Sequence, residues 1–179
     1  APEDQKPLIQ CEYNHTMGNS GGGFKEYWNL VRKYPKYQGG FIWDFVDQGL
    51  HGKDKNGTPI YTYGGDYNDY DGSDNNFNCN GIIGPDRQLN PHAYEVAYVH
   101  QNIWATPIDL QTGKIKVFNE YFFRDLSNYK LVWKLLAGGR TIQQGEIDRL
   151  NIAPQQTAEY TLPYHLDAVT NADEVLLNI

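Results

Sequence analysis

The sequence predicts an α/β segment over residues 1–103, followed by an all-β region over residues 104–179. Two observations predict this division. The first part combines short apolar runs with long stretches rich in Gly, Asn, Asp and Tyr, whereas the second part is a series of short alternating segments at regular spacing. A strand–helix–strand order requires a right-handed crossover onto a parallel sheet, and regularly spaced short strands are typical of a β-sandwich.

The first elements form a βα repeat. An apolar run over residues 7–13 predicts a buried strand that ends in a carboxylate-bearing, polar stretch. Apolar residues at helical spacing, between a run of three glycines and Pro35, predict a helix over residues 23–34. A second apolar run over residues 39–45 predicts another buried strand, which the repeat places parallel to the first.

Turn signals dominate the middle of the chain. The Asn56-Gly57 pair predicts a β-hairpin. Residues 64–80 form a long polar loop, and loops of this length are usually functional or disordered; the aromatic residues within it favour function. A helix is expected over residues 91–101. The all-β region contains five predicted strands, over residues 114–119, 129–136, 141–147, 158–162 and 174–179.

Composition limits the possible classes of protein. The 179 residues carry a formal net charge of −7, with 40% hydrophobic and 21% charged residues. The acidic balance argues against nucleic acid as a partner, because phosphates require a basic surface. No apolar run approaches the ~18–20 residues of a membrane span, so we expect a soluble protein and no membrane partner. The sequence leaves the compartment, cytoplasm or periplasm, open. Two cysteines exclude a disulfide scaffold and a four-cysteine zinc site.

The sequence ends in an apolar run. The apolar run over residues 174–179 resembles a strand still in progress, so we expect a segment of a longer protein.

Glu12 stands at the carboxyl end of the first predicted strand, where barrels of parallel strands keep their chemistry. A strand-end Glu can also simply reach solvent or pair with an Arg. The polar residues that follow Glu12, through Asn19, favour a functional role.

The segment Cys11-Glu12-Tyr13-Asn14-His15-Thr16-Met17-Gly18-Asn19 resembles the signature around the catalytic nucleophile of the β-galactosidases of glycoside hydrolase family 2. Further blocks follow in the family's order: residues 39–48, 63–66, 77–81, 86–87 and 91–92. The resemblance implies a partial (β/α)8 (TIM) barrel, followed by an incomplete immunoglobulin-like β-sandwich. It also implies a retaining glycosidase that acts on terminal non-reducing β-galactosyl groups.

The resemblance assigns roles to individual residues. Glu12 would be the nucleophile, and His15 would face the sugar hydroxyls. Trp43 would be the platform on which the galactosyl ring stacks. Asn80 would bind the sugar. Together with the backbone carbonyl of Phe77, it would also form part of a sodium site, since a hard cation prefers oxygen ligands.

The same resemblance implies that half of the site is missing. The family's acid/base Glu and its Mg²⁺ ligands lie on earlier barrel strands, so the remainder of the parent chain would be an obligatory partner. We therefore expect these residues alone to be inactive, and the parent to be a homo-oligomer. The loop from Tyr67 to Asn76 does not match the family closely, which leaves the aglycone side of the pocket open.

Other interpretations compete at three places. Gly18-Asn19-Ser20-Gly21-Gly22 fits the nucleophile elbow of α/β-hydrolases, although the preceding strand ends about five residues too early. Asp66, Asn68, Asp69, Asp71 and Asp74 could suggest calcium, but they fit no EF-hand register, and a solvated polar loop is the simpler interpretation. Cys11 is expected to be a buried packing group rather than a reactive thiol.

The aromatic residues of the all-β region have two interpretations. Tyr121, Phe122, Phe123, Tyr129 and Trp133 are expected to fill the sandwich core and its contact with the barrel. The alternative is an exposed row of rings in a non-catalytic carbohydrate-binding or assembly module. Burial of Trp133 would argue against this alternative.

Overall fold

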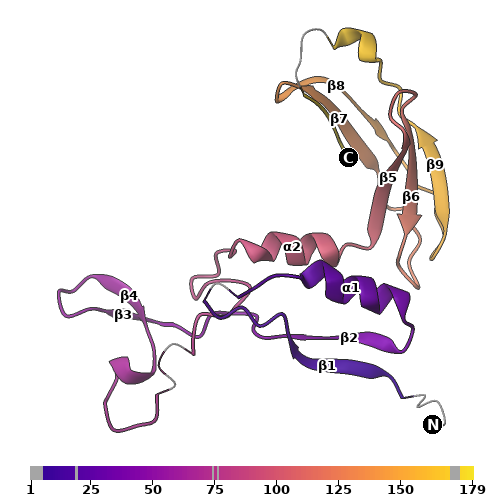
Figure 1. The fold of residues 1–179 in the computed structure, drawn as a ribbon. Coiled ribbons are helices and arrows are strands. Elements are labelled where there is room, and N and C mark those ends of the chain that lie inside the picture. Colours follow the sequence, from indigo (N-terminus) through magenta and orange to yellow (C-terminus); the bar gives the residue numbers. More distant parts are fainter. Residues whose placement is uncertain (1–5, 19, 74, 76, 170–173) are drawn as a thin grey trace. The chain divides into compact units, whose positions relative to one another are not determined.

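The computed structural model describes residues 6–18, 20–73, 75, 77–169 and 174–179 (Figure 1). Asn19, Asp74 and Asn76, which belong to motifs discussed above, lie outside the described residues. The chain separates into two compact units, Ala1–His100 and Gln101–Ile179. Each unit is described by itself.

The first unit contains the predicted βα repeat. Strand β1 (Leu8–Tyr13) is followed by helix α1 (Phe24–Lys33) and strand β2 (Tyr37–Ile42), and β1 and β2 pair in parallel. The helix ends two residues before Pro35, because the residue before a proline disfavours helical backbone. Two basic residues in its last turn complement the helix dipole.

Helix α2 (His92–Val99) packs beside α1. Tyr13, Phe24 and Val99 form the buried centre of the first unit. The two helices are also joined by polar contacts: the Arg32 guanidinium donates to the Val99 carbonyl over 2.8 Å. The end of β1 is therefore fixed to the helices through the side chain of Tyr13.

The prediction that both strands are buried is wrong for most of their side chains. Leu8, Ile9 and Phe41 are 52%, 55% and 69% exposed. In the described part of the chain, β1 and β2 form a two-stranded sheet. A sheet of two strands leaves most apolar side chains without neighbours to cover them.

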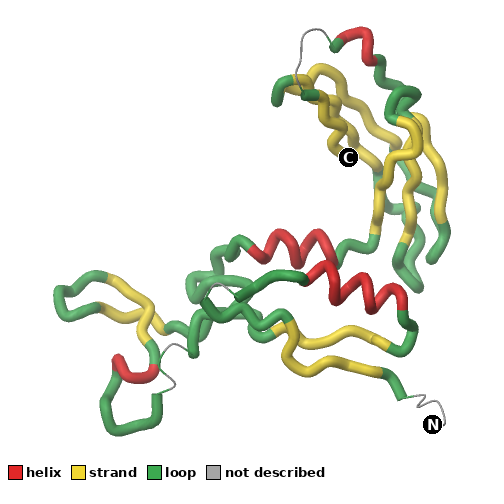
Figure 2. Tube along the Cα trace, in the orientation of Figure 1, coloured by secondary structure: helices red, strands yellow, loops and turns green. Residues whose placement is uncertain are grey.

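The predicted hairpin is confirmed. Strands β3 (Leu50–Lys53) and β4 (Pro59–Thr62) pair antiparallel, and a 3₁₀ turn (η1, Gly64–Asp66) follows. The Asp54 carboxylate accepts the backbone N–H groups of Asn56 and Thr58, both over 2.8 Å. These bonds, led by the one from Thr58, lower the pKa of Asp54 below its ordinary value. Figure 2 shows long loop segments between the hairpin and α2.

The second unit consists of two three-stranded antiparallel sheets, of order β5-β6-β9 and β10-β7-β8. The strands are β5 (Ile103–Asp109), β6 (Lys114–Asn119), β7 (Leu131–Ala137), β8 (Arg140–Ile147), β9 (Thr157–Thr161) and β10 (Val175–Asn178), with a 3₁₀ turn η2 (Leu166–Ala168). The five predicted strands are confirmed within a few residues. Strand β5 was not predicted, because Pro107 interrupts its pattern; proline is tolerated there since β5 is an edge strand.

The two sheets share one hydrophobic core, which includes Ile115 and Val117 from β6 and Leu131, Trp133 and Leu135 from β7. Trp133 is 3% exposed, so its predicted place in the core is confirmed. Its burial argues against a sugar-binding role for this ring.

Two of the predicted core aromatics are not in the core. Phe122 and Phe123 are 71% and 99% exposed, so the prediction that they lie in the sandwich core is wrong for both. They lie in the connection between β6 and β7, where the Asn119 carboxamide oxygen accepts the Tyr121 N–H and fixes the chain. Tyr121 and Tyr129 are partly buried and pack against the core cluster, as predicted.

Candidate functional site

The end of β1 is shaped to expose Glu12. Gln10 pairs with Gly40 and Tyr13 with Ile42, so β1 carries one residue more than β2 over this stretch. Such a bulge changes the direction of a side chain, and bulges are common beside active sites. Glu12 has a φ of 50° and its side chain is exposed.

Tyr13 holds this conformation in place. The ring is 3% exposed and lies against Phe24 and Tyr27, at centroid distances of 5.7 and 5.2 Å. Its hydroxyl accepts the indole N–H of Trp28 over 3.1 Å. Burial raises the pKa of Tyr13, so the hydroxyl stays protonated near neutral pH. Because a left-handed φ costs about 1–3 kcal/mol at a residue other than glycine, the buried ring supplies the packing that makes Glu12 adopt it.

His15, Trp43 and Phe77 come together beyond the ends of the parallel strands. The rings of His15 and Trp43 are stacked, with a centroid distance of 6.4 Å and an interplanar angle of 5°. The Phe77 ring lies 5.5 Å from that of His15. The backbone N–H of Trp43 donates to the Tyr13 carbonyl over 3.3 Å, which ties the main chain at Trp43 to the segment that bears Glu12. Three separate sequence blocks thus contribute to one polar and aromatic surface.

Asn80 is placed next to Trp43 by the backbone. The Asp44 N–H donates to the Asn80 carbonyl over 2.8 Å, and the Ile82 N–H donates to the Asp44 carbonyl over 2.9 Å. Val46 and Ile83 form a parallel bridge further along. Residues 80–83 therefore continue the parallel arrangement beyond β2. They place Asn80 beside Asp44, the residue that follows Trp43.

The Asn80 side chain is almost wholly buried, at 1% exposure. Its Oδ1 accepts from Gln48 Nε2 over 2.7 Å, and its Nδ2 has no hydrogen-bond partner among the described residues. A buried polar group without a partner is uncommon and calls for an explanation. The carboxamide oxygen keeps a second lone pair, so the residue fits a role as one oxygen ligand of a sodium ion.

Asp47, Asn90 and His92 hold the next residue, Gly81. Asp47 Oδ1 accepts the Gly81 N–H over 2.6 Å, while Asn90 Nδ2 donates to the Gly81 carbonyl over 2.9 Å. A ring nitrogen of His92 also lies 2.9 Å from that carbonyl. These residues border a polar cavity of about 390 Å³. The cluster fixes the loop that carries Phe77 and Asn80.

Sequence reasoning gave no role to Asp44, Asp47 or Gln48. All three lie in the block that follows β2, and this block was noted for its resemblance to the family. The signal that could have found them is the appearance of three polar residues directly after a strand that ends at the site. Their partners, Asn80 and Gly81, are more than thirty positions away in the sequence.

The structure also bears on the competing interpretations. The Ser20 hydroxyl donates to the carbonyls of Met17 and His15, over 2.7 and 3.1 Å, and so serves the loop rather than acting as a hydrolase nucleophile. The Asp66 carboxylate accepts the Tyr63 N–H, and Asn68 bonds to Asp71, so these residues stabilise turns. Among the described residues, no three His, Cys, Asp or Glu side chains come together in a way that could hold a metal ion.

The cysteines do not pack as expected. Cys11 is exposed, so its predicted burial is wrong; like Leu8 and Ile9, it lies on a strand of a two-stranded sheet, which leaves most of its side chains uncovered. Cys79 is also a free thiol. Partial burial and the nearby Asp47 carboxylate raise the pKa of Cys79, which keeps the thiol protonated.

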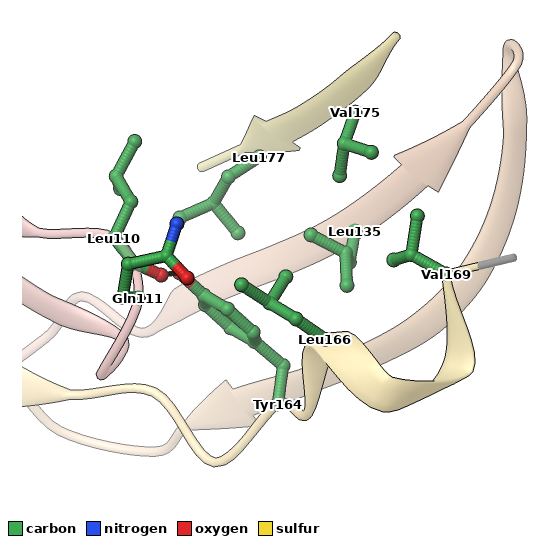
Figure 3. Close-up of a pocket in the computed structure, with 8 residues that line it drawn as sticks. All are labelled: Leu110, Gln111, Leu135, Tyr164, Leu166, Val169, Val175 and Leu177. Carbon is green, nitrogen blue, oxygen red and sulfur yellow. Dashed lines mark hydrogen bonds between the residues drawn. The ribbon is translucent and has the colours of Figure 1, made fainter. Parts of the chain in front are cut away.

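The second unit contains a different kind of pocket. Its cavity of about 290 Å³ is mainly apolar and is shown in Figure 3; its lining residues are Leu110, Gln111, Leu135, Tyr164, Leu166, Val169, Val175 and Leu177. The Tyr164 hydroxyl donates to the Leu110 carbonyl. Burial raises the pKa of Tyr164 further above neutrality. None of these lining residues carries a carboxylate, an imidazole or a thiol.

No helix in the described part of the chain has the length and apolar character needed to cross a membrane.

Comparison with known proteins points to one family. Residues 1–105 match the model of glycosyl hydrolases family 2, TIM barrel domain, and residues 115–179 match that of β-galactosidase, domain 4. The chain is 45% identical to a β-galactosidase of Pseudoalteromonas haloplanktis, over 90% of this chain and 16% of that protein. It is 39% and 40% identical to β-galactosidases of Yersinia enterocolitica and Pectobacterium atrosepticum, over 99% of this chain and 17% of each relative. The chain thus spans about a sixth of the length of these relatives.

Proposed function

Because the chain belongs to glycoside hydrolase family 2, we propose that it carries the nucleophile half of the active site of a retaining β-galactosidase. In this proposal the first unit is the last part of a (β/α)8 barrel, and the second is part of an immunoglobulin-like sandwich. The observation that supports it best is the grouping of exposed Glu12, at the carboxyl end of β1, with the stacked His15 and Trp43 rings beyond the parallel strands. Barrels of this kind keep their catalytic groups at that end of the strands.

Glu12 would act as the nucleophile in a two-step displacement. One carboxylate oxygen forms a bond to the anomeric carbon of the galactosyl group, while the bond from that carbon to the aglycone oxygen breaks. The leaving oxygen takes a proton from a general acid that is contributed by other parts of the enzyme. Water then attacks the same carbon and gives its proton to that group, now a base, and the Glu12 carboxylate is released.

The residues around Glu12 would bind and orient the sugar. Trp43, 36% exposed, offers an aromatic surface for the apolar face of a galactosyl ring. His15, stacked on the indole, would meet sugar hydroxyls at the edge of that ring. Correct orientation of a bound reactant can lower a barrier by roughly 7–11 kcal/mol, and this is the contribution expected of these side chains.

Asn80 and the Phe77 carbonyl would supply two oxygen ligands of a sodium ion, which would neutralise charge and help to hold the sugar. The support for this role is the carboxamide of Asn80, which is buried and has only part of its hydrogen-bonding capacity used. Since Asn80 is 1% exposed, ligand binding would require the neighbouring side chains to move. Mg²⁺, expected in the intact enzyme, would take its ligands from elsewhere in the protein.

The decisive experiment uses the full-length enzyme, obtained by placing this segment in the Pseudoalteromonas haloplanktis relative or from a longer reading frame. Glu12→Gln keeps the shape of the side chain and removes its nucleophilicity, so kcat should fall by roughly 10⁵-fold, the factor that corresponds to about 7 kcal/mol. A 2-fluorogalactosyl inactivator should label Glu12. Labelling of a different carboxylate, with normal folding, would refute the assignment.

A further inference from the structure

Next to Trp43 in the sequence begins a continuous chain of hydrogen bonds between three polar side chains, those of Asp44, Gln48 and Asn80. Gln48 Nε2 donates to Asp44 Oδ2 over 2.8 Å and to Asn80 Oδ1 over 2.7 Å. The other oxygen of Asp44 accepts the backbone N–H of Phe45. Asp44 and Gln48 come from the segment after β2, whereas Asn80 comes from the end of the long loop.

This chain of hydrogen bonds has a fixed polarity. An ionised carboxylate can only accept, so Asp44 requires Gln48 to present its NH₂ group rather than its oxygen. The same NH₂ group then requires Asn80 to present Oδ1. The Nδ2 of Asn80 is left on the other side, buried and without a partner among the described residues.

The Asn80 backbone is held independently of its side chain. Its carbonyl accepts the Asp44 N–H over 2.8 Å, and the Gly81 N–H that follows donates to Asp47 over 2.6 Å. With the main chain held on both sides, rotation of the carboxamide is the freedom that remains. The contact with Gln48 decides which end of the carboxamide faces which way.

We propose that Gln48 is a positioning residue of the site, and that Asp44 acts through it to fix the orientation of the Asn80 carboxamide. The inference rests on the proposed function. With this orientation Asn80 offers the second lone pair of Oδ1 to a cation and the N–H groups of Nδ2 to a sugar oxygen. A ligand oxygen at Nδ2 would restore the hydrogen bond that this buried nitrogen lacks. Reversal of the carboxamide would exchange both functions and weaken galactoside binding.

Two isosteric substitutions in the full-length enzyme reverse the polarity. Gln48→Glu replaces the donor with an acceptor, which draws Asn80 Nδ2 toward position 48 and gives up the hydrogen bond to the Asp44 carboxylate. Asp44→Asn allows an NH₂ group to face Gln48, which then turns its oxygen toward both partners and reverses Asn80 without adding charge. Gln48→Leu removes the contact and lets the carboxamide rotate. Gln38→Glu, at the other end of β2, is the matched control for the Gln-to-Glu change.

The readout is the Kd of a non-hydrolysable thiogalactoside, measured by calorimetry in sodium and in choline salts, together with kcat and KM for an aryl β-galactoside. Gln48→Glu and Asp44→Asn should each raise Kd about tenfold, which corresponds to about 1.4 kcal/mol. Gln48→Leu should raise it about threefold. The difference between the Kd measured in sodium salt and the Kd measured in choline salt should shrink in the two reversing variants. The loss in kcat/KM should come mainly from a higher KM.

The ranking separates orientation from simple packing. If Gln48 only fills space, Asp44→Asn should bind normally and Gln48→Leu should bind worse than Asp44→Asn. That order, or an unchanged Kd in both reversing variants, would overturn the proposal. If Gln48→Glu does not fold, Asp44→Asn and Gln48→Leu still give the comparison. A parent enzyme that binds no galactoside would refute the proposed function instead, independently of this ranking.

Discussion

Gly81 is the position where a single added methyl group should disturb the site most. A Cβ atom there would lie 2.2 Å from the Asp47 nitrogen, 2.5 Å from the Val46 carbonyl carbon and 2.9 Å from the Ile83 oxygen. All three are backbone atoms, so no side chain can turn away to make room. In Gly81→Ala, residues 80–83 must therefore move away from the segment after β2.

The expected cost follows from the contacts that would be lost. Overpacking at a tight site costs about 1–3 kcal/mol. The hydrogen bonds from Asp44 to Asn80 and from Gly81 to Asp47 contribute about 1 kcal/mol each. The sum, about 4 kcal/mol, corresponds to roughly a thousandfold greater population of the locally opened state.

Hydrogen–deuterium exchange in the full-length enzyme measures this opening. The Ile82 and Ile83 amides, which donate to the Asp44 and Phe45 carbonyls, should exchange roughly a thousandfold faster in Gly81→Ala. The activity should fall about a hundredfold, because Asn80 moves relative to Trp43. Gly72→Ala is the control, since a Cβ there meets nothing within 4 Å. Normal exchange and activity in Gly81→Ala would refute the reasoning.

Three further predictions concern the rest of the chain. The 179 residues alone should show no turnover of an aryl β-galactoside in a chromogenic assay, since the general acid is absent from the proposed half-site; measurable turnover would contradict that division. Asp54→Ala should destabilise the β3–β4 hairpin, as judged by faster amide exchange. In acid, the exchange rates of the variant and of the unsubstituted chain should become equal. The sign follows from the lowered pKa of folded Asp54: its contribution is complete above the unfolded pKa of about 4 and is lost as the pH falls through the folded value. Trp133→Ala should destabilise the second unit by about 3–5 kcal/mol in urea unfolding, whereas Phe123→Ala should change stability by less than about 0.5 kcal/mol; equal effects would contradict the assigned burial.

Features with local causes were predictable from the sequence. The helix α1 has its apolar residues at helical spacing and ends before Pro35, and the hairpin turn contains Asn56-Gly57. The position of Glu12 at the end of a strand parallel to the one before Trp43 also followed from the order of these elements. In the helix and the hairpin turn, the residues that determine the structure lie within a few positions of one another. The parallel pairing of the two strands, about thirty positions apart, follows from the crossover rule for a strand–helix–strand unit.

Features that depend on distant neighbours were decided by the tertiary structure alone. Phe122 and Trp133 are both aromatic, yet one is exposed and the other buried, because the fold places only Trp133 between the two sheets. Likewise, the polarity that Asp44 imposes on Asn80 through Gln48 exists only once the loop returns to the end of β2. A sequence pattern shows which side chains can donate or accept, but the direction of a hydrogen bond depends on which groups the folded chain brings into contact.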